Sequence, residues 1–231
     1  MSWAPDGIGE GKAGLGVPWE EEEIQLGTIV VLVRHGRTRW NHERRFLGTT
    51  DIPLDEVGRR QARSMAAALP RPFDCVYTSP LARAMETAEF LTDQPVERMG
   101  LRELWQGDLE GLSVSEGYGR YPEFFAAFAR DPTHVRVPGG ESLGACRDRA
   151  VQVMEEIGHA HDSGAVVAVV THQMVIASVA CTLAGEPMSR WRGHGVRNVA
   201  MTVLRRLRDT WSVVVEDWRF DDGVGRVPPD V

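Results

Sequence analysis

The sequence predicts an α/β fold, a three-layer α/β/α sandwich around a mainly parallel central sheet. Two observations carry this prediction. The runs at 28–33 (TIVVLV) and 166–170 (VVAVV) are continuously apolar and rich in β-branched residues, which is typical of strands buried on both faces. Segments with helical periodicity separate such runs along the chain. Strands that alternate with helices form parallel sheets with helices on both sides.

The other expected elements follow in chain order. A helix over 54–69 has Asp55 as its expected N-cap. A short strand at 75–77 precedes a helix that opens at Ser79 and Pro80 and runs to Leu91. The last expected elements are a helix at 141–157, the strand at 166–170, a helix at 174–183, and two strands at 199–204 and 211–215 joined by a turn near Arg208.

The length of 231 residues fits one domain, which we place at 28–220. Residues 1–27 are rich in Gly and Glu and lack periodicity, so we expect a flexible N-terminal tail there, and a C-terminal tail at 221–231. Six acids and one base of the chain lie in the first tail, although the whole chain has a net charge of only -7. The remaining body is nearly neutral, which argues against a nucleic-acid partner.

The three cysteines, Cys75, Cys146 and Cys181, are far apart and form no C-x-x-C pair. Such a set is typical of reduced thiols in a cytoplasmic protein. No signal peptide is evident, and no apolar stretch approaches the ~18 residues that a membrane span requires. We therefore expect a cytoplasmic protein without a membrane partner. The sequence does not exclude a homo-oligomer.

Basic residues follow three of the expected strands. Arg34 and His35 come after the first strand, Arg83 follows the strand at 75–77, and His172 follows the strand at 166–170. In parallel sheets ligands bind beyond the carboxyl ends of the strands. A cluster of cationic groups favours an anionic occupant, because like charges repel in the empty site. Arg matches phosphate oxygens and neutral His can attack phosphorus. The cluster therefore indicates phosphoryl transfer.

A metal site is the alternative use of the two histidines. The sequence has no H-x-x-H or H-x-x-x-H spacing, which metal sites on helices commonly show. A cation would also lie unfavourably beside Arg34 and Arg83. We expect no metal and no other cofactor.

Five ordered blocks carry a family resemblance: 32–41 (LVRHGRTRWN), 45–54 (RFLGTTDIPL), 78–88 (TSPLARAMETA), 101–111 (LRELWQGDLEG), and 138–142 (PGGES) with 170–172 (VTH). They resemble the histidine phosphatase superfamily, which includes the cofactor-dependent phosphoglycerate mutases. The resemblance spans about 28–205. It implies the phosphoglycerate mutase-like fold and a phosphoryl-transfer enzyme.

The resemblance also implies roles for individual residues. His35 matches the nucleophile, His172 a member of the phosphate pocket that takes part in catalysis, and Glu103 the acid that protonates the leaving group. Other matched positions are expected to bind substrate or phosphate: Arg34, Thr38, Asn41, Gly48, Arg83 and Gln173. The chain departs from the family at Gln173, where glycine is usual, and at Leu47, where the residue is often polar. These departures concern the leaving-group side of the site.

The insertion at 112–138 favours a phosphatase over a mutase. In the family's mutases this insertion is long and holds an Arg-rich tract that clamps a bisphosphate and keeps water away, whereas here it is short. The aromatic residues of this insertion have two possible structural roles. They form either a small cap helix that packs on the domain or an apolar wall for the leaving group, to which Leu47 and Trp105 would add. The aromatic residues are Tyr118, Tyr121, Phe124, Phe125 and Phe128.

The sequence as a whole predicts a metal-independent phosphomonoesterase that hydrolyses a small phosphorylated metabolite through a phosphohistidine on His35. His194 and Arg197 could also reach the mouth of its site. Two alternatives stay open. One is mutase-type phosphoryl transfer, and the other is a catalytically silent member of the family that binds a phosphorylated ligand.

Overall fold

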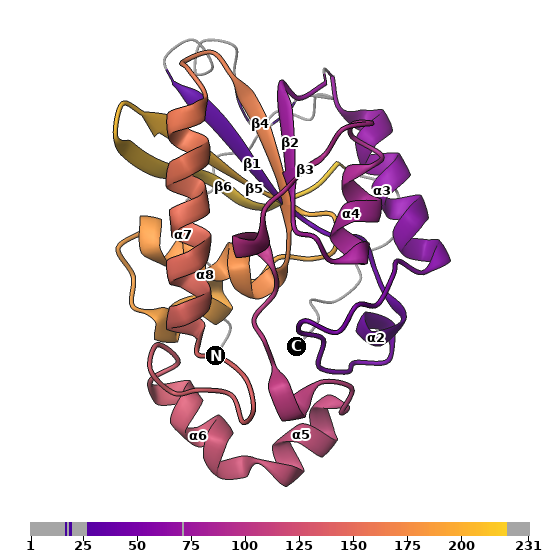
Figure 1. The fold of residues 1–231 in the computed structure, drawn as a ribbon, viewed down its shortest axis with the longest axis vertical. Helices are drawn as coiled ribbons and strands as arrows, with labels where there is room; N and C mark the ends of the chain where they lie inside the picture. The colour runs from indigo at the N-terminus through magenta and orange to yellow at the C-terminus, as the bar shows by residue number, and fades with distance from the viewer. Residues whose placement is uncertain (1–16, 18, 20–26, 71, 221–231) are drawn as a thin grey trace, which may run out of the picture.

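A six-stranded sheet in the order β3-β2-β4-β1-β5-β6 forms the centre of the computed structural model, which describes residues 17, 19, 27–70 and 72–220 (Figure 1). The four strands from β3 to β1 run parallel, and β5 pairs antiparallel with both β1 and β6. The strands are β1 Thr28–Arg34, β2 Cys75–Thr78, β3 Val96–Glu97, β4 Val166–Thr171, β5 Met201–Leu207 and β6 Thr210–Trp218. The expected mainly parallel sheet is confirmed.

Two pairs of helices cover the sheet and complete the expected three layers. The first pair is α3 (Glu56–Ala68) and α4 (Ala82–Ala88), and the second is α7 (Leu143–Ala160) and α8 (Gln173–Leu183). Figure 1 shows three smaller helices beyond the carboxyl ends of the parallel strands. They are α2 Arg39–His42, α5 Val114–Arg120 and α6 Pro122–Arg130. Three short 3-10 helices complete the described chain: η1 Met99–Leu101, η2 Gly107–Leu109 and η3 Met188–His194.

Strand β1 lies in the middle of the core and all seven of its residues are buried. Val30 and Leu32 join the apolar cluster under α7 and α8, whereas Ile29 and Val31 join the cluster under α3 and α4. Each fully buried side chain of this size contributes about 1.5–3 kcal/mol to folding. Because β1 packs on both faces, its carboxyl end, with Arg34 and His35, is held in the most constrained part of the molecule.

Most element boundaries differ from those expected by one to three residues, and the backbone explains two of the starts. The helix predicted to open at Ser79 begins at Ala82, because Leu81 is extended (φ -72°, ψ 134°) and serves as the N-cap. The strand predicted from Val199 begins at Met201, because Val199 has a left-handed backbone (φ 54°) that ends β-type pairing. The expected N-cap is confirmed, since a side-chain oxygen of Asp55 accepts from the Gly58 N–H at 2.7 Å.

The two expected tails lie outside the described residues, except for a few positions. Of these, Trp19 is only 5% exposed and belongs to the apolar cluster under α3 and α4. No helix in the described part of the chain is both long and apolar enough to cross a membrane.

A close backbone approach fixes the loop that follows His35. Gly58, in the first turn of α3, lies against the backbone of Arg37, so that an added Cβ would collide with the Arg37 carbonyl oxygen and lie 2.8 Å from its nitrogen. Gly36 approaches the Gly58 carbonyl in the same way. The start of α3 therefore sets the position of the loop that follows His35.

We expect Gly58→Ala to lower the free energy of unfolding by about 1–3 kcal/mol, because the methyl group must displace the Arg37 backbone. The measurement is the midpoint of urea unfolding. Gly119→Ala in α5 is the matched control: nothing lies within 4 Å of its added Cβ, so it should stabilise the protein by roughly 0.5–1 kcal/mol. Equal midpoints for the two variants would contradict this account of Gly58.

Candidate active site

Two imidazoles and two guanidiniums meet at the carboxyl ends of β1, β2 and β4. The rings of His35 and His172 have centroids 5.1 Å apart. Arg83 and His172 are 0% exposed, His35 is 3% exposed and Arg34 is 4% exposed. The structure therefore brings together the four residues that the strand ends predicted. Burying these groups is costly unless an anionic occupant compensates the charge.

The tautomer of His35 follows from its backbone contact. Its Nδ1 lies 2.7 Å from the Gly36 carbonyl oxygen, which can only accept, so Nδ1 carries the hydrogen. Nε2 is then the atom with the free lone pair. Burial lowers the pKa of His35 well below its ordinary value, and the charges of Arg83 and Arg34 lower it further. At neutral pH His35 is therefore an uncharged imidazole that can act as a nucleophile.

A strained turn at Val199 holds the backbone next to His35. The Asn198 amide donates to the His35 carbonyl at 2.9 Å. Arg34 donates its N–H to Ala200 and accepts from Val199 through its carbonyl. The positive φ of Val199 lets the chain turn between these contacts, although a β-branched residue is unfavourable there. The contacts made by this turn hold His35 in place, and the left-handed backbone of Val199 is the conformational cost of making them.

His172 is oriented by Ser79, a residue that the sequence argument did not single out. His172 Nε2 lies 2.8 Å from Ser79 Oγ, and the same Oγ accepts from the Leu81 N–H. The Ser79 hydroxyl hydrogen has no other acceptor among the described residues, so it is donated to Nε2. The hydrogen of His172 then lies on Nδ1, a buried atom with no partner in the described part of the chain. Nδ1–H is a donor to which a phosphoryl oxygen would bind.

Arg83 holds the loop around Gly48. Its terminal nitrogens donate to the carbonyls of Gly48 (2.6 Å) and Thr50 (3.0 Å). Glu110 accepts from the backbone N–H groups of Thr49 and Thr50 on the same loop. An added Cβ at Gly48 would collide with the Glu110 carboxylate. Gly48 was expected to bind phosphate; its carbonyl oxygen accepts from Arg83, and it is not among the residues that line the cavity described below.

Glu103 is a buried carboxyl group that faces the site. It is 5% exposed, and burial raises its pKa above the ordinary value. One oxygen accepts from the Leu104 N–H at 2.8 Å, and the other lies 3.4 Å from the Met174 N–H. A carboxyl group with a raised pKa is suited to donate a proton near neutral pH.

The backbone around Glu103 is held by Arg149 on α7. Its guanidinium donates to the carbonyls of Gly100, Arg102 and Glu103 and pairs with Glu141 at 2.6 Å. Glu141 in turn accepts from the Trp105 N–H. These contacts fix the chain on both sides of Glu103. Arg149 lies outside the recognised blocks, and no local sequence signal would have found it.

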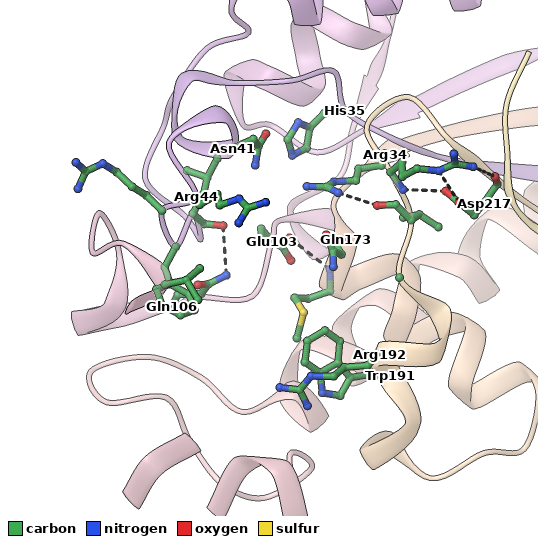
Figure 2. A pocket seen from close by; sticks show the side chains of 18 residues that line it. Arg34, His35, Asn41, Arg44, Glu103, Gln106, Gln173, Trp191, Arg192 and Asp217 are labelled. Carbon is green, nitrogen blue, oxygen red and sulfur yellow. Dashed lines mark hydrogen bonds and ion pairs between the residues drawn. The ribbon is translucent and has the colours of Figure 1, made fainter. Parts of the chain in front are cut away.

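A cavity of about 380 Å³ opens in front of these groups (Figure 2). Five of the predicted site residues line it: Arg34, His35, Asn41, Glu103 and Gln173. Arg83 and His172 are fully buried beside His35 and are not among the lining residues. Thr38 caps helix α2 by accepting from the Asn41 N–H. Figure 2 shows His35 and Asn41 at one end of the cavity, Trp191 with Arg192 at the other, and Glu103 between them.

Four further residues were expected near the mouth of the site, and only two of them line the cavity. Leu47 and Arg197 line the cavity, and Arg197 is paired with Asp217 at 2.7 Å. His194 does not line it, because its ring contacts Glu216 instead. Trp105 also does not line it, and its side chain is 48% exposed. Several further residues line the cavity that the sequence did not predict, among them Arg44, Gln106, Met174, Trp191, Arg192 and Val196.

Comparison with known proteins agrees with this geometry. The family model described as "Histidine phosphatase superfamily (branch 1)" matches residues 30–218. The chain belongs to the histidine phosphatase superfamily.

Two relatives and one solved structure illustrate its place in the superfamily. Phosphoglycerate mutase-like protein 4 of Arabidopsis thaliana is 36% identical over 211 residues, which cover 85% of this chain and 87% of the relative. Phosphoserine phosphatase 1 of Hydrogenobacter thermophilus is 33% identical, with 76% of this chain and 85% of the relative covered. A mycobacterial glucosyl-3-phosphoglycerate phosphatase has a TM-score of 0.74 at 27% identity, with 82% of this chain and 98% of that structure covered. These similarities confirm the expected enzyme class and support phosphatase activity.

We expect Ser79→Ala to lower kcat/KM about tenfold in this superfamily member, because the lost hydrogen bond leaves His172 free to adopt the wrong tautomer (about 1–1.5 kcal/mol). Ring ¹⁵N shifts of His172 should report a mixture of tautomers. Ser178→Ala is the matched control, since that buried hydroxyl donates to the Val175 carbonyl in α8. Unchanged His172 shifts in Ser79→Ala would refute the positioning role.

Proposed function

We propose that this protein is a metal-independent phosphomonoesterase that hydrolyses a small phosphorylated metabolite through a phosphohistidine on His35. The observation that carries the proposal is the tautomer of His35. Its Nδ1–H is occupied by the Gly36 carbonyl, so the Nε2 lone pair is available to a phosphorus atom in the cavity. The buried Arg34, Arg83 and His172 lie beside it as donors.

The proposed reaction has two steps, transfer of the phosphoryl group to His35 and hydrolysis of the phosphohistidine. His35 Nε2 attacks phosphorus while the bond to the ester oxygen breaks, and the Glu103 carboxyl group gives its proton to the departing oxygen. Water then attacks the phosphohistidine, the P–N bond breaks, and the Glu103 carboxylate takes the proton of that water. Arg34, Arg83 and the Nδ1–H of His172 bind the phosphoryl oxygens throughout.

The charged side chains beside His35 are the guanidinium groups of Arg83 and Arg34. In the described residues no group of three or more His, Cys, Asp or Glu side chains could hold a metal ion. The donor set around His35 is cationic, and such a set repels a cation while it stabilises the charge of the phosphoryl group. This chemistry supports a reaction that needs no metal.

The insertion at 112–138, which contains helices α5 and α6 and is called the cap from here on, supports hydrolysis over mutase-type transfer. Arg120, Arg130 and Arg136 are the arginines of the insertion, and none of them lines the cavity. Arg120 lies over the Tyr121 ring and Arg136 donates to the Gly140 carbonyl. The cap therefore brings no guanidinium to a second phosphate, and water can reach the phosphohistidine.

Mutase-type transfer remains the second candidate because of Arg44 and Arg192. Both line the cavity and could bind a second anionic group; Figure 2 shows Arg44 near Asn41 and Arg192 at the end opposite His35. A bisphosphate-primed mutase assay with 3-phosphoglycerate separates the two candidates, since only a mutase returns the phosphoryl group to the substrate.

The first test is phosphate release from p-nitrophenyl phosphate, sugar phosphates, phosphoserine and phosphoglycerates in the presence of EDTA. We expect release by the wild type and a trapped phosphohistidine that is labile in acid. His35→Ala should lose the intermediate and at least about 10³-fold in rate, because no other group replaces the nucleophile. An active His35→Ala variant, or activity abolished by EDTA, would disprove the proposal.

Glu103→Gln tests the proton donor through its pH dependence. The acid form of Glu103 is the active one, so kcat/KM for an alkyl phosphate should fall as pH rises through the raised pKa of Glu103. The variant should lose this limb and about 10²–10⁴-fold in kcat/KM for alkyl esters. With p-nitrophenyl phosphate the loss should be smaller, because that leaving group departs without a proton. An equal loss for both substrates would contradict the role.

A further inference from the structure

We infer that an apolar annex beside the catalytic cavity binds the organic part of the substrate, so that the preferred substrates are phosphomonoesters whose alcohol carries one apolar ring. This inference rests on the proposed function and adds the substrate class to it. The annex is a space of about 140 Å³ between the cap helices and the domain body. Its chief walls are Tyr118, Phe124, Phe125, Phe128, Met174 and Trp191.

The aromatic walls hold one another in place. Phe125 stacks on Tyr118 with ring centroids 3.9 Å apart and on Phe46 at 5.7 Å. Phe124 contacts both Phe125 and Phe128. Phe128 is 6% exposed and belongs to the core under α7 and α8. The cap aromatics thus pack on the domain and also leave a formed apolar space, which needs little reorganisation to bind a ring.

The annex opens into the catalytic cavity on the side of the proton donor. Val114, Met174 and Trp191 line both spaces. The Met174 N–H lies 3.4 Å from a Glu103 oxygen, so the annex begins next to the group that protonates the leaving oxygen. An alcohol that departs from phosphorus toward Glu103 therefore has its carbon chain directed into the annex.

Two unsatisfied polar atoms mark the junction between the spaces. Gln106 Oε1 and Trp191 Nε1 are buried and have no hydrogen-bond partner among the described residues. Both side chains line both spaces. A hydroxyl or amide group on the leaving group could accept from Trp191 and donate to Gln106, which would satisfy both atoms. The junction therefore suits a short polar link between the phosphate and the ring.

The volume limits the size of the bound group. An apolar cavity of ~150 Å³ in another protein accepts benzene, so the annex of about 140 Å³ fits one six-membered ring and not two fused rings. A small polar alcohol such as the serine side chain of phosphoserine would leave the annex unfilled. Filling it with a ring should raise kcat/KM on the order of 100-fold.

The test compares 2-phenylethyl phosphate, ethyl phosphate, phosphoserine and 2-(1-naphthyl)ethyl phosphate. The four leaving alcohols are all primary, and the unsubstituted ethyl ester sets the baseline. We expect the phenylethyl ester to exceed ethyl phosphate and phosphoserine by about 100-fold in kcat/KM, and the naphthyl ester to fall below the phenylethyl ester. Phosphoserine as the best substrate, or a phenylethyl-to-ethyl ratio near one, would overturn the inference while phosphatase activity stands. No release from any ester and no phosphohistidine would instead refute the proposed function.

Two variants change the annex in opposite directions. Val114→Phe fills the junction, and we expect the phenylethyl-to-ethyl ratio to fall toward one. Phe124→Ala enlarges the annex and should shift the preference toward the naphthyl ester. Ala126→Phe, at an exposed position of the same cap, is the matched control and should keep the wild-type ratio. Ratios that stay the same in both annex variants would overturn the inference, and Phe124→Ala keeps it testable if Val114→Phe does not fold.

Discussion

The site depends on one electrostatic constraint: two guanidiniums must stay charged in a buried space while the imidazoles beside them stay neutral. Burial lowers the pKa of Arg83 to about 10, which leaves it charged at neutral pH. The same burial, with the charge of Arg83, lowers the pKa of His35 and of His172 well below the ordinary value. Arg meets this constraint because the pKa of a solvated guanidinium lies far above neutral pH, so that it stays charged even when burial lowers the pKa. A buried Lys readily loses its proton. The guanidiniums thus keep their charge, and the imidazole of His35 keeps the lone pair that the proposed mechanism requires.

The fold meets this constraint with backbone carbonyls rather than with carboxylates alone. Arg83 donates to the carbonyls of Gly48 and Thr50, and Arg34 donates to the carbonyl of Val196. Carbonyls orient a guanidinium without cancelling its charge, so the full charge remains available to a phosphate. The loops that carry these carbonyls are themselves held by Glu110 and by the strained turn at Val199. The loops that carry Gly48, Thr50 and Val196 therefore fix the orientation of the Arg83 and Arg34 side chains.

The sequence predicts those parts of the site that depend on local pattern. His35 and His172 each follow an apolar run, and the end of such a run fixes where a parallel strand delivers its next residue. Ser79 and Arg149 could not be predicted in this way, because each acts on a residue distant in the chain: Ser79 contacts His172 and Arg149 contacts the Glu103 backbone. Only tertiary packing brings those pairs together. The prediction was wrong for Trp105, where an aromatic residue next to the site points to solvent, and pattern does not reveal side-chain direction.

The body and the cap contribute different kinds of interaction to the same cavity. The body supplies charge and hydrogen bonds at the strand ends, and the cap supplies apolar surface from α5 and α6. They meet at Met174, whose backbone contacts Glu103 and whose side chain lines the annex. Under the proposed function, changes in the cap would therefore alter which alcohol is accepted without moving His35 or Arg83, because those residues are fixed by the sheet and by loops on its rim. Specificity and chemistry would then be separable, because different parts of the chain would determine them.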